Sequence, residues 1–207
     1  HDNPDKDPYM AFEKHFMRYM LSDGAGAVLV QDHPEGICPL KIEWVDMTSY
    51  ANELPTCMFM ASELQEDGRL KSWKEFSPDE IKERAVLVGK QDIRQLKKYI
   101  IKYWVDHIET ILAKHHVKAE EIDYIIPHVS SMFFYEKLND EIAARNIALT
   151  KEKWFTNLTS VGNIGSAAIY VALEELIRTK EIKRGNKILL LVPESGRFSY
   201  GTVLLSV

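Results

Sequence analysis

Residues 91–207 alternate between helical patterns and short apolar runs, and this order restricts the fold more than any other feature of the chain. A strand buried on both faces reads as a continuous apolar run, whereas a helix covering it shows apolar residues every three or four positions. The alternation therefore predicts an α/β layer around a largely buried sheet. The expected helices are 91–116, 131–145 and 165–179, and the expected strands are 122–126, 154–158, 187–192 and 200–207, the last two forming a hairpin.

The first 90 residues are less regular. Residues 10–21 read as a short helix or the approach to a strand, and the small-residue turn 22–27 leads into a β-branched run, Val28–Val30. We expect that run to be a buried strand, paired as a hairpin with a second strand at 40–45. Further on, Ser77 followed by Pro78 is typical of a helix start, with an N-cap serine and a proline at the first helical position.

Composition excludes several classes of function. The 207 residues are 45% hydrophobic and 28% charged, which is ordinary for a globular chain, and the net charge of −5 argues against a general nucleic-acid binder. No apolar run is long enough to predict a membrane span. Cys38 and Cys57 lack a CxxC partner and the histidines lack zinc spacing, so we expect a reduced, cytoplasmic protein without a metal. The chain begins with His1, and we expect it to be a fragment of a longer protein.

The stretch from Asn157 to Tyr170 combines a Gly-Asn turn with a helix that opens on small residues. Small residues at a helix start indicate that something packs close to the backbone, either a neighbouring helix or a ligand. Asn163 lies between Gly162 and an Ile-Gly pair, so its carboxamide is presented on a tight turn.

Three polar features follow three successive strands of the predicted sheet. His128 follows the first strand, Asn163 the second, and the turn Ser195–Phe198 the third. Ligands of open α/β sheets gather outside the carboxyl ends of the strands, so these features could meet in one pocket. A histidine and an asparagine together can donate hydrogen bonds to an oxygen that becomes negative. Taken singly, each is better explained as a strand-end histidine or a turn asparagine.

Four segments, in this order, resemble the C-terminal half of β-ketoacyl-acyl-carrier-protein synthase III, in the thiolase-like superfamily. They are Leu21–Ala27, Ile126–His128, Gly162–Ala168, and Gly185–Leu190 leading to Gly196–Gly201. The resemblance implies a layered αβα C-terminal half preceded by the last strands of the N-terminal half. It divides the chain into the tail end of the N-terminal half (1–45), a connecting insertion (46–85) and the C-terminal domain (86–207).

The resemblance also implies a reaction, decarboxylative Claisen condensation of an acyl thioester with malonyl-acyl-carrier protein, in fatty-acid or specialised lipid and polyene biosynthesis. His128 and Asn163 hold the positions that stabilise the enolate, and Gly196 matches the loop glycine whose amide helps to hold the thioester oxygen. The substrates are then acyl-CoA and the carrier thioester, with no further cofactor. Lys137 and Arg145, on the helix after His128, are our expected docking residues for the acidic acyl-carrier protein, and the full-length protein is expected to be a homodimer.

The sequence departs from the family pattern at the nucleophile. The family's reactive cysteine lies upstream of the segment at 21–27, where this chain has none, and Cys38 and Cys57 both follow that segment. Two further departures are Val129–Ser131 after the histidine and Glu194–Arg197 in the glycine loop. The alternative function is therefore a non-catalytic partner subunit with the same fold. A hydrolase is disfavoured because the chain has no Gly-x-Ser-x-Gly elbow.

Overall fold

The computed structural model describes residues 12, 15, 19–36 and 38–207, and its centre is a four-stranded sheet with strand order β1-β8-β7-β6. These strands are β1 (Lys41–Ser49), β6 (Tyr124–Pro127), β7 (Lys187–Glu194) and β8 (Ser199–Ser206). β6 and β7 are parallel, with Ile125 opposite Leu189, whereas β8 runs antiparallel to both β7 and β1. The predicted strands at 40–45, 122–126, 187–192 and 200–207, and the closing hairpin, are confirmed.

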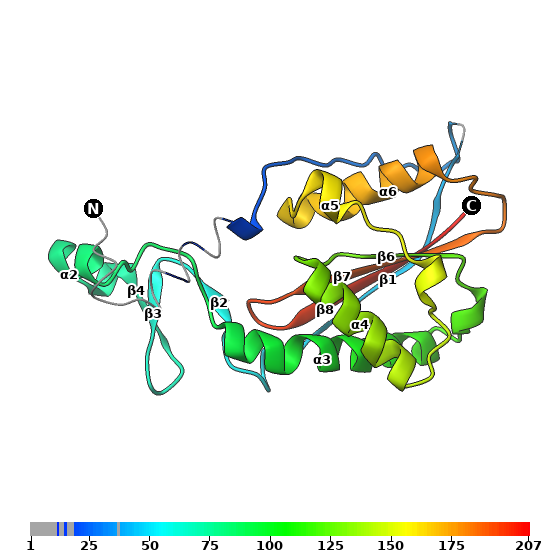
Figure 1. The fold of residues 1–207 in the computed structure, drawn as a ribbon. Coiled ribbons are helices and arrows are strands. Elements are labelled where there is room, and N and C mark those ends of the chain that lie inside the picture. The colour runs from blue at the N-terminus through cyan, green and yellow to red at the C-terminus, as the bar shows by residue number, and fades with distance from the viewer. Residues whose placement is uncertain (1–11, 13–14, 16–18, 37) are drawn as a thin grey trace.

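Helices cover both faces of the sheet (Figure 1). α3 (Ile93–Lys114) and α4 (Met132–Ala144) lie on one face, and α5 (Leu158–Val161) and α6 (Ala168–Thr179) lie on the other. Both helix layers contact β7. Leu189 and Leu191 pack with α3 and α4 on one face. Ile188 and Leu190 pack with α6 on the other face. The continuous apolar run of this strand is therefore buried from both sides, as expected for a covered sheet.

The long helix α3 follows the predicted apolar stripe. Asp92 caps its start by accepting hydrogen bonds from the backbone N–H groups of Arg94 and Gln95, which satisfies donors that have no partner within the helix. Its buried residues are Leu96, Ile100, Trp104, Val105, His107, Ile108, Ile111 and Leu112. Within the described part of the chain, no helix combines the length and the apolar character that crossing a bilayer requires.

Residues 50–92 leave the sheet and carry short elements of their own. These are β2 (Met58–Phe59), β3 (Ser62–Leu64), β4 (Leu70–Ser72), α2 (Pro78–Glu83) and β5 (Lys90–Gln91), with β2 pairing β5 and β3 pairing β4. The predicted N-cap at Ser77 is confirmed, as a capping box with Glu80. Single-turn 3₁₀ helices complete the chain at 73–75, 119–121, 151–153 and 165–167. β3, β4 and α2 stand beyond one end of the sheet (Figure 1).

Two strand predictions are wrong. Val28–Val30 is extended but forms no strand and is largely exposed, because no described segment lies beside it to complete a ladder. The predicted hairpin with 40–45 therefore does not form, and that strand, β1, pairs with β8 instead. Residues 154–158 make a single parallel bridge from Trp154 to Ile125, after which the chain turns into α5. The element predicted at 10–21 falls mostly outside the described residues.

The expected domain boundary between residues 45 and 46 falls within β1, and β1 is part of the same sheet as β6, β7 and β8. The backbone therefore continues without a break from the segment assigned to an N-terminal half into the C-terminal sheet.

The small residues of 162–170 are explained by another part of the same chain. The segment 22–26 lies directly against them, and the N–H of Ser22 donates to the carbonyl oxygen of Asn163 at 2.8 Å. A Cβ atom on Gly24 would come within 2.7 Å of Ile164, and one on Gly26 within 2.8 Å of Tyr170. Because real Cβ atoms do not approach so closely, both glycines are required by this packing. The small-residue turn at 22–27 and the small-residue helix start at 162–170 therefore pack against each other.

Candidate active site

The carboxyl ends of β6 and β7 lie at one edge of the sheet, where the predicted site residues were expected. Pro127 pairs with Leu191, and the N–H of His128 donates to the Leu191 carbonyl oxygen at 2.8 Å. The parallel bridge at Trp154 carries the chain after residue 154 towards the same edge. The parallel pairing therefore brings the ends of all three predicted strands together, although the middle one is reduced to a bridge.

A small cavity of about 20 Å³ opens beside His128 at this edge. This volume is enough for about one water molecule. The cavity is lined by Ile126, Pro127, His128, Val129, Thr156, Asn157, Leu158, Gly162, Ala168, Ile169 and Ala172. The lining joins the end of β6, the turn before α5 and the start of α6, which are the elements that the sequence motifs identified.

The imidazole of His128 is partly buried, and this burial lowers its pKa below the ordinary histidine value of 6.5. Among the described residues the ring has no hydrogen-bond partner, since only its backbone N–H is engaged. The ring is therefore neutral at neutral pH and can donate from one nitrogen while accepting at the other. Such a ring can donate a hydrogen bond to a carbonyl oxygen without bringing a full positive charge.

Asn163 is buried, and its carboxamide is oriented by its own turn. Its Oδ1 accepts a hydrogen bond from the N–H of Gly165 at 3.1 Å. Because the oxygen is engaged in this way, the amide NH₂ remains as the available donor, and among the described residues it has no partner. Gly162, whose φ is 84°, supplies the left-handed backbone that turns Asn163 inward from α5. Among the described residues, Gly162 lines the cavity with His128, whereas Asn163 does not.

Gly196 is held from both sides in the turn between β7 and β8. Its carbonyl oxygen accepts hydrogen bonds from the N–H groups of Cys57 at 2.9 Å and Met58 at 3.4 Å. Its own N–H donates to Oε1 of Glu194. The amide that the resemblance assigned to a thioester oxygen is thus engaged with a carboxylate of the same turn.

The thiol of Cys57 is poorly suited to nucleophilic chemistry. It is fully buried, it donates to the Asp92 carbonyl oxygen at 3.3 Å, and burial raises its pKa to about 12. Because the thiolate is the reactive form, this group is inert in the folded chain. Cys38 is partly exposed. Among the described residues, no group of three or more histidine, cysteine or acidic side chains is arranged to hold a metal ion.

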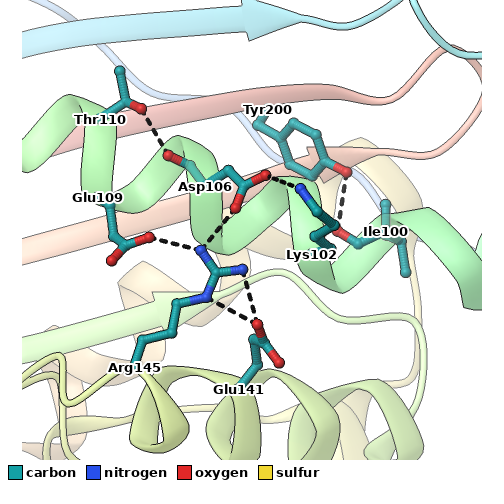
Figure 2. Close-up of polar contacts among 8 residues, drawn as sticks. All are labelled: Ile100, Lys102, Asp106, Glu109, Thr110, Glu141, Arg145 and Tyr200. Carbon is teal, nitrogen blue, oxygen red and sulfur yellow. Dashed lines mark hydrogen bonds and ion pairs between the residues drawn. The ribbon is translucent and has the colours of Figure 1, made fainter.

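The two residues expected to dock a carrier protein have different surroundings. Arg145 is engaged by three carboxylates, with ion pairs of 2.7 Å to Asp106, 2.6 Å to Glu109 and 2.8 Å to Glu141 (Figure 2). Its guanidinium therefore ties α4 to α3, and it is only 22% exposed. Lys137 is exposed, and its ion pair with Asp140 is long, at 3.9 Å.

Sequence reasoning missed Asn157 as part of the site. Its Nδ2 donates to Glu175 on α6 at 2.7 Å, which fixes the turn that lines the cavity. The strand predicted at 154–158 includes this residue. The apolar spacing of 154–158 gave no signal for the turn, because the same letters fit a strand and a short helix equally well.

Residues 112–207 match the family model for 3-oxoacyl-[acyl-carrier-protein] synthase III C terminal. β-Ketoacyl-[acyl-carrier-protein] synthase III of Clostridium acetobutylicum is 30% identical over 112 residues, which cover 54% of this chain and 33% of the relative. The protein of the same name from Clostridium perfringens strain SM101 is 27% identical over 188 residues, covering 91% of this chain and 52% of the relative. The chain thus spans from about a third to about half of the length of these relatives.

Among solved structures, 3-oxoacyl-[acyl-carrier-protein] synthase III from Aquifex aeolicus superposes with a TM-score of 0.54 at 25% identity. This superposition covers 80% of the present chain and 44% of the Aquifex chain. The fold predicted from the sequence, a thiolase-like α/β arrangement, is confirmed by these neighbours.

Proposed function

We propose that this chain, which is similar to the C-terminal domain of β-ketoacyl-acyl-carrier-protein synthase III, forms half of a condensing enzyme. The proposed reaction is decarboxylative Claisen condensation of an acyl thioester with malonyl-acyl-carrier protein. The observation that carries the proposal is the pair of available donors, the neutral imidazole of His128 and the carboxamide NH₂ of Asn163. Both follow the strand-end turns that the family motifs predict.

The chemistry assigns a definite task to these donors. When malonyl thioester loses its carboxylate as carbon dioxide, the electron pair of the broken bond moves into an enolate whose oxygen carries the charge. Donors aimed at that oxygen stabilise the transition state more than the ground state. The enolate carbon then attacks the acyl thioester carbonyl and displaces the thiolate. A neutral histidine suits this role, because a protonated one would stabilise the malonyl carboxylate before it leaves.

The nucleophile that carries the acyl group is proposed to lie outside this sequence. The burial and raised pKa of Cys57 support this assignment, as does the position of Cys38 after the segment at 21–27. The alternative, a non-catalytic partner subunit of a ketosynthase with the same fold, keeps these features without the reaction. A cysteine in a strand-to-helix turn of an upstream half would favour the enzyme, and an upstream half without one would favour the partner subunit.

The test uses the protein joined to its upstream half, with carbon dioxide release from malonyl-carrier protein as the assay. His128→Ala and Asn163→Ala are expected to abolish release while leaving the circular dichroism spectrum unchanged. Matched controls are His33→Ala, at an exposed histidine, and Asn139→Ala, on α4 away from the cavity. Near-normal release by either site variant would remove the proposal, whereas loss in the controls as well as in the site variants would point to a general effect on folding.

We further propose that the acidic carrier protein docks on a surface that includes Lys97 and Lys137. A hollow of about 380 Å³ between α3 and α4 includes Lys97 and Lys137 in its lining, and the Nζ of Lys97 lies 5.8 Å from the centre of the Phe133 ring. The lining also holds the apolar side chains of Phe133 and Phe134 and two acids, Asp140 and Glu141, of which Glu141 is paired with Arg145. Exposed lysines beside an apolar floor suit an acidic helix with an apolar face. Arg145 is not included, because its charge is compensated by three carboxylates.

Charge reversal tests this surface. Lys97→Glu combined with Lys137→Glu is expected to slow association of the carrier protein and to reduce the dependence of binding on salt, because both effects follow from rim charges. Lys180→Glu, just beyond the end of α6, is the matched control. Unchanged association with the double variant would exclude this surface. The same proposal includes an acyl-CoA as the acyl donor and a homodimer as the state of the full-length protein.

A further inference from the structure

The turn at the end of β7 contains a pair of main-chain donors that is already filled by an acidic side chain. Oε1 of Glu194 accepts from the N–H of Gly196, and Oε2 accepts from the N–H of Arg197 at 3.1 Å. Two successive N–H groups that converge on one anion form a nest, a common binding arrangement for anionic oxygens. Here the occupant is a carboxylate from the same turn.

The backbone of this nest is fixed by the neighbouring segments. The Gly196 carbonyl oxygen is bonded to the N–H groups of residues 57 and 58, and the hydroxyl of Ser195 accepts from Gln91 at 2.9 Å. The guanidinium of Arg197 donates to the buried hydroxyl of Thr56. Because bonds from two segments far apart in the sequence hold the turn, its donors stay in place when their occupant changes.

The occupant itself can move. Glu194 is exposed, whereas Gly196 is buried. A Cβ atom at position 196 would lie 2.6 Å from Oε1 of Glu194 and 3.3 Å from the Met58 carbonyl oxygen, so only glycine allows the carboxylate to reach its amide. The rigid part of the contact is therefore the donor pair, and the part that can rotate into solvent is the Glu194 side chain.

We propose that Glu194 is a latch on the Gly196–Arg197 donor pair, which an acyl thioester oxygen must displace to bind there. This inference rests on the proposed function together with the resemblance, which assigns the Gly196 amide to the thioester oxygen, and it adds a residue that sets the apparent affinity of that amide for acyl substrates. A ligand whose site is open for only a fraction of the time binds more weakly by that fraction. Removing the carboxylate therefore tightens acyl thioester binding without adding any contact.

The test follows the amide resonances of Gly196 and Arg197 by NMR while butyryl-CoA is titrated into the protein joined to its upstream half, the form in which the proposed reaction is tested. In Glu194→Ala the two resonances are expected to saturate at a concentration about tenfold lower than in the wild type, as for a donor pair that is otherwise open about a tenth of the time. Glu194→Gln, which keeps an acceptor oxygen without the charge, is expected to fall between them. Glu181→Ala, at an exposed acid outside the turn, is the matched control and should titrate as the wild type does.

Two results would overturn the latch. Equal titration of Gly196 and Arg197 in the wild type and in Glu194→Ala would show that the carboxylate does not compete. Absence of any shift at these amides in either protein would show that the donor pair does not bind the thioester. Neither result bears on carbon dioxide release by the His128 and Asn163 variants, so the proposed reaction stands or falls separately.

Discussion

Replacing Arg145 by methionine removes the charge that connects α3 and α4 while keeping most of the side chain's apolar stem. Arg145 is 22% exposed and pairs with carboxylates that are 30%, 47% and 37% exposed. Pairs in such surroundings contribute about 0.2–1 kcal/mol each, so three of them give roughly 1–3 kcal/mol. A cation after the last turn of a helix adds a few tenths more through the macrodipole. For a chain of this size, 1 kcal/mol corresponds to about 2–4 °C, so a loss of roughly 1–3 kcal/mol should lower the Tm by about 2–12 °C.

The pH dependence separates this ion network from loss of packing. Burial pushes the pKa of Asp106 upward, but the hydrogen bonds from Lys102 and Arg145 outweigh it and leave the pKa below the ordinary value of 3.8. A carboxyl group with a depressed pKa stabilises the fold above its unfolded pKa, and this contribution is lost as the pH falls through the folded pKa. The difference in Tm between wild type and Arg145→Met should therefore be full at pH 7 and shrink below about pH 4.

The matched control is Arg178→Met, because Arg178 also lies at the end of a helix but has one exposed pair, with Glu174 at 3.3 Å. We expect this change to cost less than about 0.5 kcal/mol. Thermal unfolding followed by circular dichroism at pH 7 and pH 3 measures both variants. An equal loss in the two variants, or a loss for Arg145→Met that persists at pH 3, would refute the network as the source of the effect.

Three further predictions concern single buried or strained positions. Burial lowers the pKa of His107 from 6.5 to about 4. The stability contributed by its neutral ring is therefore complete above pH 6.5 and is lost as the pH falls towards 4. In His107→Gln the free energy of unfolding, measured by urea titration, should vary less with pH over this window. In the native chain a thiol reagent should modify Cys38 and leave Cys57 unreacted until the protein is unfolded, and rapid native reaction at Cys57 would contradict its burial. Gly162→Ala should destabilise the chain more than Gly185→Ala in urea titrations, because both glycines have positive φ but only a Cβ at 162 would collide with a neighbouring side chain, that of Ser22.

The local patterns of the sequence determined most of the sheet and its helices. The apolar run at 187–192 needed burial on both faces, and the stripe of α3 needed a sheet to cover, so the layered order followed from periodicity alone. Asp92 and Ser77 both begin helices as N-caps, since the capping hydrogen bonds form within a few residues of the cap. His128 and Asn163 could be named because each follows a recognisable local turn.

Tertiary structure decided everything that depends on a distant partner. Val28–Val30 has the composition of a strand, but a strand exists only where another supplies its hydrogen bonds, and no described segment does so. Arg145 looked like a free docking charge until α3 brought Asp106 and Glu109 to it, beside Glu141 of its own helix. Cys57 became inert through burial beneath a turn more than a hundred residues away. Sequence determines which groups a segment offers, whereas the environment that sets their charge, exposure and partners is made only when distant segments pack together.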